Sequence, residues 1–124
     1  MAVTYSAATK DARMTAVRDE IDSGGAGQII IGTAGLATVL AEFDLETQSG
    51  TISAGVLTFA SFPKSDTAAN NSGTAAEAKI VNGSAADVVT TLTVGTSGSD
   101  VNLDSTTITA GQTVTLNSAT ITHF

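Results

Sequence analysis

Apolar residues follow the spacing of an α-helix in one part of the chain only, residues 6–22. A narrow apolar stripe with i, i+3 and i+7 spacing is formed there by Met14, Val17 and Ile21. Ser6 can cap this segment, because its hydroxyl oxygen can accept a hydrogen bond from an N–H group of the first helical turn. Two glycines at positions 24 and 25 provide a stop signal. The pattern predicts one N-terminal helix.

After these glycines, short runs of apolar and β-branched residues are separated by Gly, Ser, Asn and Asp. Strands are predicted at residues 28–32, 38–45, 56–62, 75–81, 88–94, 100–104, 106–109, 113–117 and 119–124. Asn82 and Gly83 lie between two of these runs and predict a hairpin, since both residues tolerate a positive φ. The small and polar residues 64–73 are predicted to form a mobile loop.

These elements predict a mainly β fold: an antiparallel β-sandwich, jelly-roll-like, with one N-terminal α-helix. The length of 124 residues suits a single domain, in which residues 1–25 form an N-terminal arm and helix and residues 26–124 form the sandwich. Few large apolar side chains are available to the strands, so burial at ~25 cal/mol per Å² stabilises this core less than an aromatic-rich one. Self-association is predicted for that reason.

Charge is distributed unevenly along the chain. Residues 1–18 carry three basic residues and one acidic residue, whereas residues 19–124 carry two basic and eleven acidic residues, for a total of −7. This excess of acid opposes binding to nucleic-acid phosphates. No window approaches ~18 uninterrupted apolar residues, and the first residues lack the features of a secretory signal, so no membrane association is expected. The absence of cysteine excludes disulfides, thiol catalysis and cysteine zinc sites.

Three patterns that resemble functional sites have simpler structural explanations. Glu42, Asp44 and Glu46 alternate along one strand face, but no nearby loop supplies further Ca²⁺ ligands, so a solvated face is expected. Residues 95–100 resemble a phosphate-binding loop without the lysine and helix that should follow, so a turn is expected. His123, the one histidine, lacks partners for a metal or catalytic site. The sequence therefore predicts a protein that is not an enzyme and has no metal or cofactor.

Two stretches resemble a family of small structural proteins of tailed bacteriophages. Residues 5–17 read YSAATKDARMTAV and are similar to the family's opening, Y-S-x-x-x-x-x-A-R-x-x-A-V/I. Residues 94–117 read VGTSGSDVNLDSTTITAGQTVTLN and are similar to its ending, which contains G-T-x-G-x-D and I-x-x-G-Q-x-V. Residues 78–83 occupy the place of the family's central hairpin. About half of the chain is covered, and it lacks the aromatic residues and cysteine that some relatives carry mid-chain.

The resemblance implies a capsid decoration, or cement, protein. Such proteins are jelly-roll-like domains that assemble as dimers or trimers on the outside of an icosahedral head. This chain would be made in the host cytoplasm and would bind the major capsid protein at the outer surface of the phage head. There it would stabilise the contacts between capsomers, because many weak contacts act together.

The N-terminal segment is the candidate docking element, because it combines the basic cluster with an apolar stripe. The candidate interface residues are Tyr5, Lys10, Arg13, Met14, Val17 and Arg18. A helix that only covers one open end of the sandwich is equally compatible with the sequence.

Two other functions remain open. The chain could be a minor virion component of the tail, neck or fibre. It could also be a surface recognition domain that binds carbohydrate or the host envelope through loops such as residues 64–73. A carbohydrate site usually contains an aromatic platform, and this sequence has one tyrosine and no tryptophan, which disfavours the last alternative.

Overall fold

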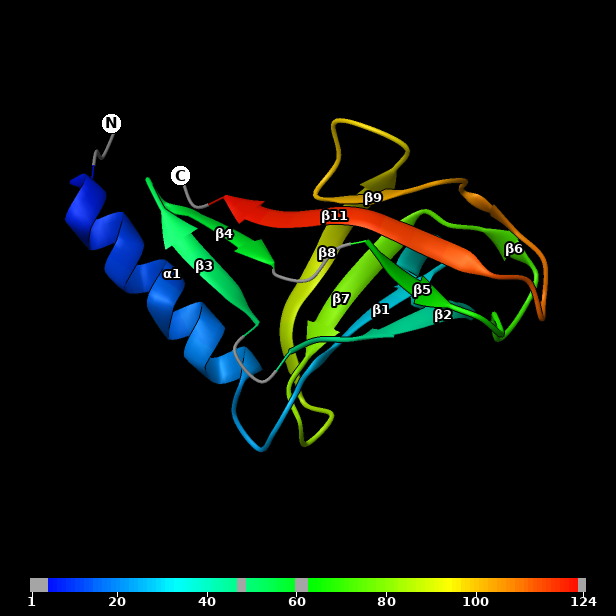
Figure 1. Ribbon diagram of the computed structural model, residues 1–124, viewed down its shortest axis with the longest axis horizontal. Coiled ribbons are helices and arrows are strands. Elements are labelled where there is room, and N and C mark those ends of the chain that lie inside the picture. The colour runs from blue at the N-terminus through cyan, green and yellow to red at the C-terminus, as the bar shows by residue number, and fades with distance from the viewer. Residues whose placement is uncertain (1–4, 47–48, 60–62, 123–124) are drawn as a thin grey trace.

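The computed structural model describes residues 5–46, 49–59 and 63–122 (Figure 1). One helix, α1 (Ala7–Ile21), precedes the strands, and a short 3₁₀ turn covers Ala34–Leu36. The strands are β1 (Gln28–Gly32), β2 (Val39–Asp44), β3 (Gly50–Ser53), β4 (Val56–Phe59), β5 (Lys64–Asp66), β6 (Gly73–Thr74), β7 (Glu77–Val81), β8 (Asp87–Gly95), β9 (Val101–Leu103), β10 (Thr107–Ile108) and β11 (Val114–Thr122). The prediction of a mainly β chain with one N-terminal helix is confirmed.

The strands form a curled sheet in the order β2-β1-β7-β8-β9-β11-β4-β3, and β6 and β10 pair separately. All pairs are antiparallel except β8 with β9, which are parallel. The long strand β11 organises the sheet. Its beginning pairs with β5, its middle with β9 and its end with β4.

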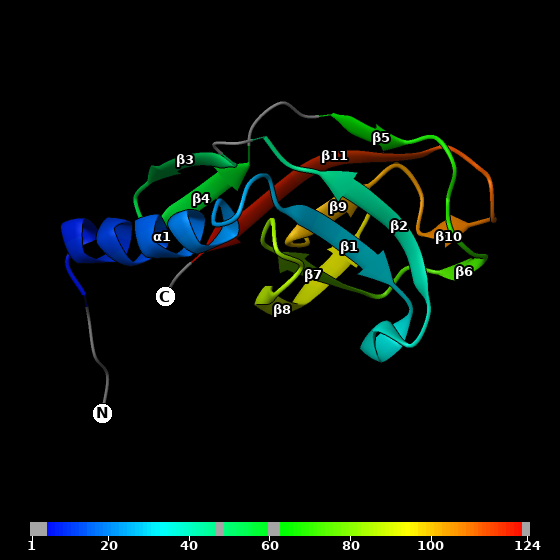
Figure 2. The same ribbon diagram turned by 90° about the horizontal axis from the view of Figure 1, so that it is seen from below.

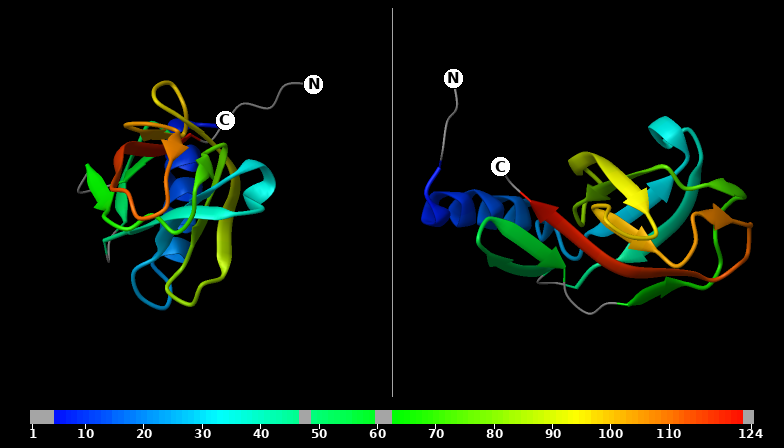
Figure 3. Two further views of the ribbon diagram at one scale, coloured as in Figure 1. Left: turned by 90° about the vertical axis from the view of Figure 1, so that its right-hand side faces the viewer. Right: turned by 90° about the horizontal axis from the view of Figure 1, so that it is seen from above.

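Hydrogen bonds bring β2, at one edge of the sheet, next to β5 and the segment that follows it. The Glu42 amide donates to Asp66 Oδ2 at 3.0 Å, and the Asn70 amide donates to the Leu40 carbonyl at 2.8 Å. These contacts satisfy backbone groups that an open edge would expose. Seen from the end, the strands curl around a common interior (Figure 3, left), so that opposite parts of the sheet face each other as the layers of a sandwich do.

One continuous cluster of buried apolar side chains fills this interior, and it includes residues of both the strands and the helix. Its largest fully buried members are Phe43, Met14, Ile21, Ile29, Ile31, Leu40, Leu57, Ile80, Leu103, Ile108, Leu116 and Val101. Burial of one such side chain is worth about 1.5–3 kcal/mol. Because Met14 and Ile21 belong to this cluster, α1 is part of the core.

The structure corrects the prediction for residues 64–73. Lys64–Asp66 forms strand β5, because these residues align with Val114–Leu116 of β11. The backbone pairing decides the conformation here, and the small polar side chains that favoured a loop point to solvent or are half-buried. Gly73–Thr74 is likewise a strand, paired with β10.

Several strand predictions need adjustment at their ends. The two runs predicted at 113–117 and 119–124 are a single strand, β11, with an irregularity in its register between Leu116 and Ser118. Strand β3 lay in a segment for which the sequence predicted none. The last residues of the predicted strands 56–62 and 119–124 lie outside the described residues, as does His123. The predicted hairpin is confirmed as β7–β8. Its turn has a positive φ at Ala85 and not at Asn82 or Gly83, and Asn82 Oδ1 accepts hydrogen bonds from two backbone amides of the turn.

Candidate functional site

Helix α1 lies at one end of the long axis of the molecule, against the hairpin of β3 and β4 (Figure 2). Its N-cap is as predicted, since Ser6 Oγ accepts a hydrogen bond from the Thr9 amide at 3.2 Å. Apolar contacts attach the helix on one side only. Met14 and Ile21 are buried, whereas Thr9, Ala12, Arg13 and Ala16 are exposed.

Two aspartates fasten the helix to both ends of strand β3. Asp11 Oδ1 accepts a hydrogen bond from the Gly55 amide at 2.7 Å, and Asp22 Oδ1 accepts one from the Ser49 amide at 3.1 Å. Ala54 and Gly55 have φ values of 52° and 78°, as the two central residues of a type I′ hairpin turn do. This turn leaves the Gly55 amide free to bond to the helix, which therefore has a fixed position on the hairpin.

An apolar pocket lies between α1 and the sheet. It has a volume of about 220 Å³ and is lined by Arg13, Met14 and Val17 from the helix, Val89 from β8 and Ile121 from β11. Val17, Val89 and Ile121 are half-buried and pack against the core. We call this the helix pocket. It contains three of the six residues that the sequence placed in the candidate interface.

A fourth candidate residue, Tyr5, contacts Arg13, which lines the helix pocket. The Arg13 guanidinium lies over the Tyr5 ring, 4.6 Å from the ring centroid, a cation–π contact. Tyr5 is 39% exposed and is the one large apolar side chain that is exposed among the described residues. The positive charge that lines the helix pocket is thus in contact with an aromatic ring.

The structure separates the two remaining candidates. Lys10 is half-buried and lies one helical turn before Arg13 and Met14, so it belongs to the same side of the helix. Arg18 faces the β3 strand instead, where its Nη1 donates to the Gly50 carbonyl at 3.5 Å. Its Nε is 3.8 Å from Asp19 Oδ1. Arg18 therefore contributes to the attachment of the helix and not to the helix pocket.

Val89 and Ile121 are not among the candidate interface residues predicted from the sequence. Each lies in a predicted strand whose alternation indicates only that one face is buried. Their position beside α1 depends on the pairing of β11 with β4 and on the crossing of β8 near the helix. No local signal in the sequence contains this information.

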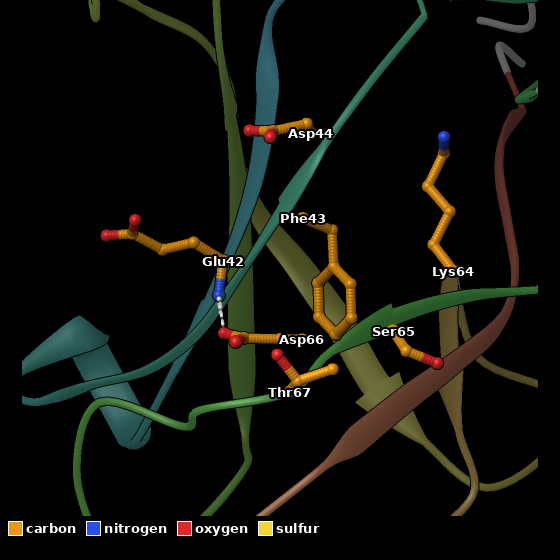
Figure 4. Close-up of a pocket in the computed structure, with 7 residues that line it drawn as sticks. All are labelled: Glu42, Phe43, Asp44, Lys64, Ser65, Asp66 and Thr67. Carbon is orange, nitrogen blue, oxygen red and sulfur yellow. Dashed lines mark hydrogen bonds between the residues drawn. The ribbon is translucent and has the colours of Figure 1, made fainter. Parts of the chain in front are cut away.

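A second hollow, of about 370 Å³, is lined mostly by polar residues of β2 and β5 (Figure 4). Two of the acidic residues predicted to form a solvated face, Glu42 and Asp44, are among them. Three of the carboxylates there, those of Asp44, Glu46 and Asp66, already bind groups of the chain itself. Asp66 accepts from the Glu42 and Ala68 amides, Asp44 from Gln28, and Glu46 pairs with Lys64 at 3.1 Å. Among the described residues, no three His, Cys, Asp or Glu side chains lie together in a way that could hold a metal ion. Asp66 and Glu46 link β5 to β2 and to the segment that follows β2, and Asp44 links β2 to β1.

Residues 96–100 connect the parallel strands β8 and β9. Asp100 Oδ2 accepts hydrogen bonds from both the amide and the hydroxyl of Thr93 at 3.1 Å, and the Asp100 amide donates to Thr93 Oγ1 at 3.0 Å. Asn102 bonds to the amide and the carbonyl of Ser99. This segment is a closed loop held by its own side chains and, as predicted, no helix follows it.

Other residues of the stretch 94–117 have similar structural roles. Asp104 Oδ1 accepts from the Thr115 amide at 3.3 Å, and Gln112 Oε1 accepts from the Thr109 amide at 2.7 Å. Gly111 has a φ of 83°, which favours glycine. The residues that carry the family resemblance in this stretch thus build turns and strand pairing.

No helix among the described residues is long and apolar enough to cross a lipid bilayer. Comparisons of the chain with models of protein families, with curated proteins and with solved structures gave no match. The geometry of the helix pocket and the sequence patterns are therefore the basis for the function proposed below.

Proposed function

We propose that this protein decorates the head of a tailed bacteriophage. It binds the major capsid protein on the outside of the shell and strengthens the contacts between capsomers. The observation that carries the proposal is the helix pocket: an apolar hollow with a basic rim, on a helix that is fixed to an otherwise acidic domain. Such a surface favours contact with a protein, and the resemblance of residues 5–17 and 94–117 to phage structural proteins supports the same role.

A decoration protein needs no catalytic residues, only contact free energy. DNA packed in the head pushes the shell outward, and a protein bound across capsomer boundaries must be released before the capsomers separate. A contact with a Kd of about 1 mM is worth about 4 kcal/mol, and many copies on one shell act together. Modest contacts such as one filled pocket and one or two charge pairs are therefore sufficient for each copy.

Self-association as a dimer or trimer belongs to this proposal. The core is built mainly from aliphatic residues, and its buried aromatic members among the described residues are Phe43 and Phe59. Contacts between copies would add stability by mass action. Light scattering at micromolar concentration is expected to show a dimer or trimer, and a single monomeric species would contradict this part of the proposal.

The test of the function is reconstitution on phage heads that lack this chain. The purified protein is mixed with such heads, the heads are pelleted, and the bound protein is measured as a function of its concentration. Saturable binding and a higher temperature of head disruption are expected. Binding to tails or necks alone would support a minor virion component, and binding to glycans without binding to heads would support a recognition domain.

A further inference from the structure

We infer that the helix pocket binds one apolar side chain of a partner protein, and that carboxylates next to that side chain pair with Arg13 and Lys10. This inference rests on the proposed function, in which the partner is the shell subunit. It adds the chemistry of the contact: an apolar anchor flanked by acidic residues.

The size and lining of the helix pocket indicate a single side chain. Its volume of about 220 Å³ is below the roughly 300–1,000 Å³ of typical small-molecule sites. Met14, Val17, Val89 and Ile121 supply an apolar lining from three different elements. An aromatic or large aliphatic side chain can bury its surface there without leaving a polar group unpaired.

The charge at the rim selects acidic neighbours for that side chain. Arg13 lines the helix pocket and Lys10 lies one turn away, whereas residues 19–124 carry a net charge of −9. In the described part of the chain, Lys64 and Lys79 are held in ion pairs with Glu46 and Asp87. The first turns of the helix, which carry Lys10 and Arg13, are therefore the region where an acidic segment is attracted to this protein.

A second copy of this chain related by a two-fold axis fits the helix pocket less well than a different protein. The one exposed large apolar side chain among the described residues is Tyr5, which lies against Arg13. Two copies related by a two-fold axis would place the same surface on both sides of the contact. Lys10 and Arg13 would then face their own equivalents, and like charges in an interface disfavour binding.

Two variants of the full chain test the inference by different means. R13E reverses the charge at the rim, and V89F places a ring in the helix pocket without changing the charge. K79E is the control for charge, because it makes the same change from +1 to −1 on β7 and not on the helix, where Lys79 pairs with Asp87. Circular dichroism and thermal unfolding check that each variant is folded.

The first probe is an acetylated, amidated peptide in which one phenylalanine lies between two glutamates. Addition of this peptide to the isotope-labelled protein is expected to shift the NMR signals of Val17, Val89 and Ile121. The peptide is expected to bind with a millimolar Kd. R13E should weaken binding at least fivefold, V89F should abolish it, and K79E should leave it unchanged. Shifts elsewhere in the protein, or equal binding by R13E, would overturn the inference.

The second probe is the phage head without this chain, which separates the inference from the proposed function. Heads that bind the wild type and K79E, but bind R13E and V89F at least tenfold more weakly, support both. If heads bind all four proteins equally, the helix pocket is not the docking site, but the proposed function is still supported. Heads that bind none contradict the proposed function, and the peptide titration then decides the chemistry of the pocket by itself.

Discussion

Thr91 has a φ of 62°, in the left-handed region that a β-branched residue rarely adopts. It lies in β8 where the pairing with β7 shifts register, from Ala78 opposite Leu92 to Ile80 opposite Val89. The conformation costs roughly 1–2 kcal/mol for a residue with a Cβ atom. Glycine avoids this cost but loses more conformational entropy on folding, about 0.5–1 kcal/mol.

We therefore expect T91G to raise the free energy of unfolding by about 0.5–1 kcal/mol. The neighbouring Thr90 is exposed and is not among the residues with a positive φ, so T90G should lower the free energy of unfolding. Urea denaturation of the two variants measures the difference. A destabilised T91G protein would show that Thr91 is not strained at the point where the register between β7 and β8 shifts.

Ser49 is 1% exposed, and its hydroxyl oxygen has no hydrogen-bond partner among the described residues. An unpaired buried polar group costs about 1–3 kcal/mol. S49A should therefore increase stability by about 1 kcal/mol, because the Ser49 amide keeps its bond to Asp22. S118A provides the opposite case, since Ser118 Oγ accepts from Asn102 Nδ2 at 3.0 Å. S118A should lower the melting temperature and S49A should raise it.

Single aspartate side chains attach helix α1 to the hairpin of β3 and β4. Asp11 accepts one short hydrogen bond from the β3–β4 turn, and bonds to charged groups contribute about 1.5–3 kcal/mol. We expect D11A to lower the free energy of unfolding by about 1–2 kcal/mol, and D11N, which keeps a carbonyl acceptor, to lower it less. Asp19 is the control, because its side chain is 68% exposed and lies 3.8 Å from Arg18. Equal effects of D11A and D19A on chemical denaturation would contradict this attachment.

The loop between β8 and β9 depends on one reciprocal pair, Thr93 and Asp100. Three hydrogen bonds join these two residues. A double-mutant cycle with T93V and D100A is expected to give a coupling free energy of about 1–2 kcal/mol. Additive effects in urea denaturation would show that the two side chains act independently.

The elements differ in how far the sequence predicts them. The cap at Ser6 and the turn at Asn82 are local, so their residues alone identify helix α1 and the β7–β8 hairpin. Strand β5 is not local, because the conformation of Lys64–Asp66 depends on β11, some fifty residues later. The helix pocket likewise combines residues that the sequence places together and residues that it does not. Helical spacing places Arg13, Met14 and Val17 together, but Val89 and Ile121 join them only through tertiary packing.

The whole molecule is elongated, with α1 at one end and the β6–β10 pair at the other (Figure 3, right). The helix is both a part of the core and the carrier of the candidate docking residues. The two roles that the sequence left as alternatives, covering the sheet and presenting a binding surface, are therefore compatible in one element.

Deletion of residues 1–22 should then destabilise the domain and not only remove a docking surface. It removes Met14 and Ile21, which are buried, and at about 1.5–3 kcal/mol each their loss is a large part of a typical domain's stability. Thermal unfolding of the truncated chain is expected to be broad or to occur at a much lower temperature. A truncated chain with an unchanged, cooperative transition would show that the helix is not needed for folding, and point variants such as R13E remain the cleaner test of docking.

The most direct test of the proposed function is the number of copies of this chain in a phage particle. Particles purified on a density gradient are analysed for the amount of this chain relative to the major capsid protein. We expect one copy per shell subunit, or a simple fraction of that number. A dozen copies or fewer per particle would place the chain in the tail or neck, and its absence from purified particles would contradict the proposed function.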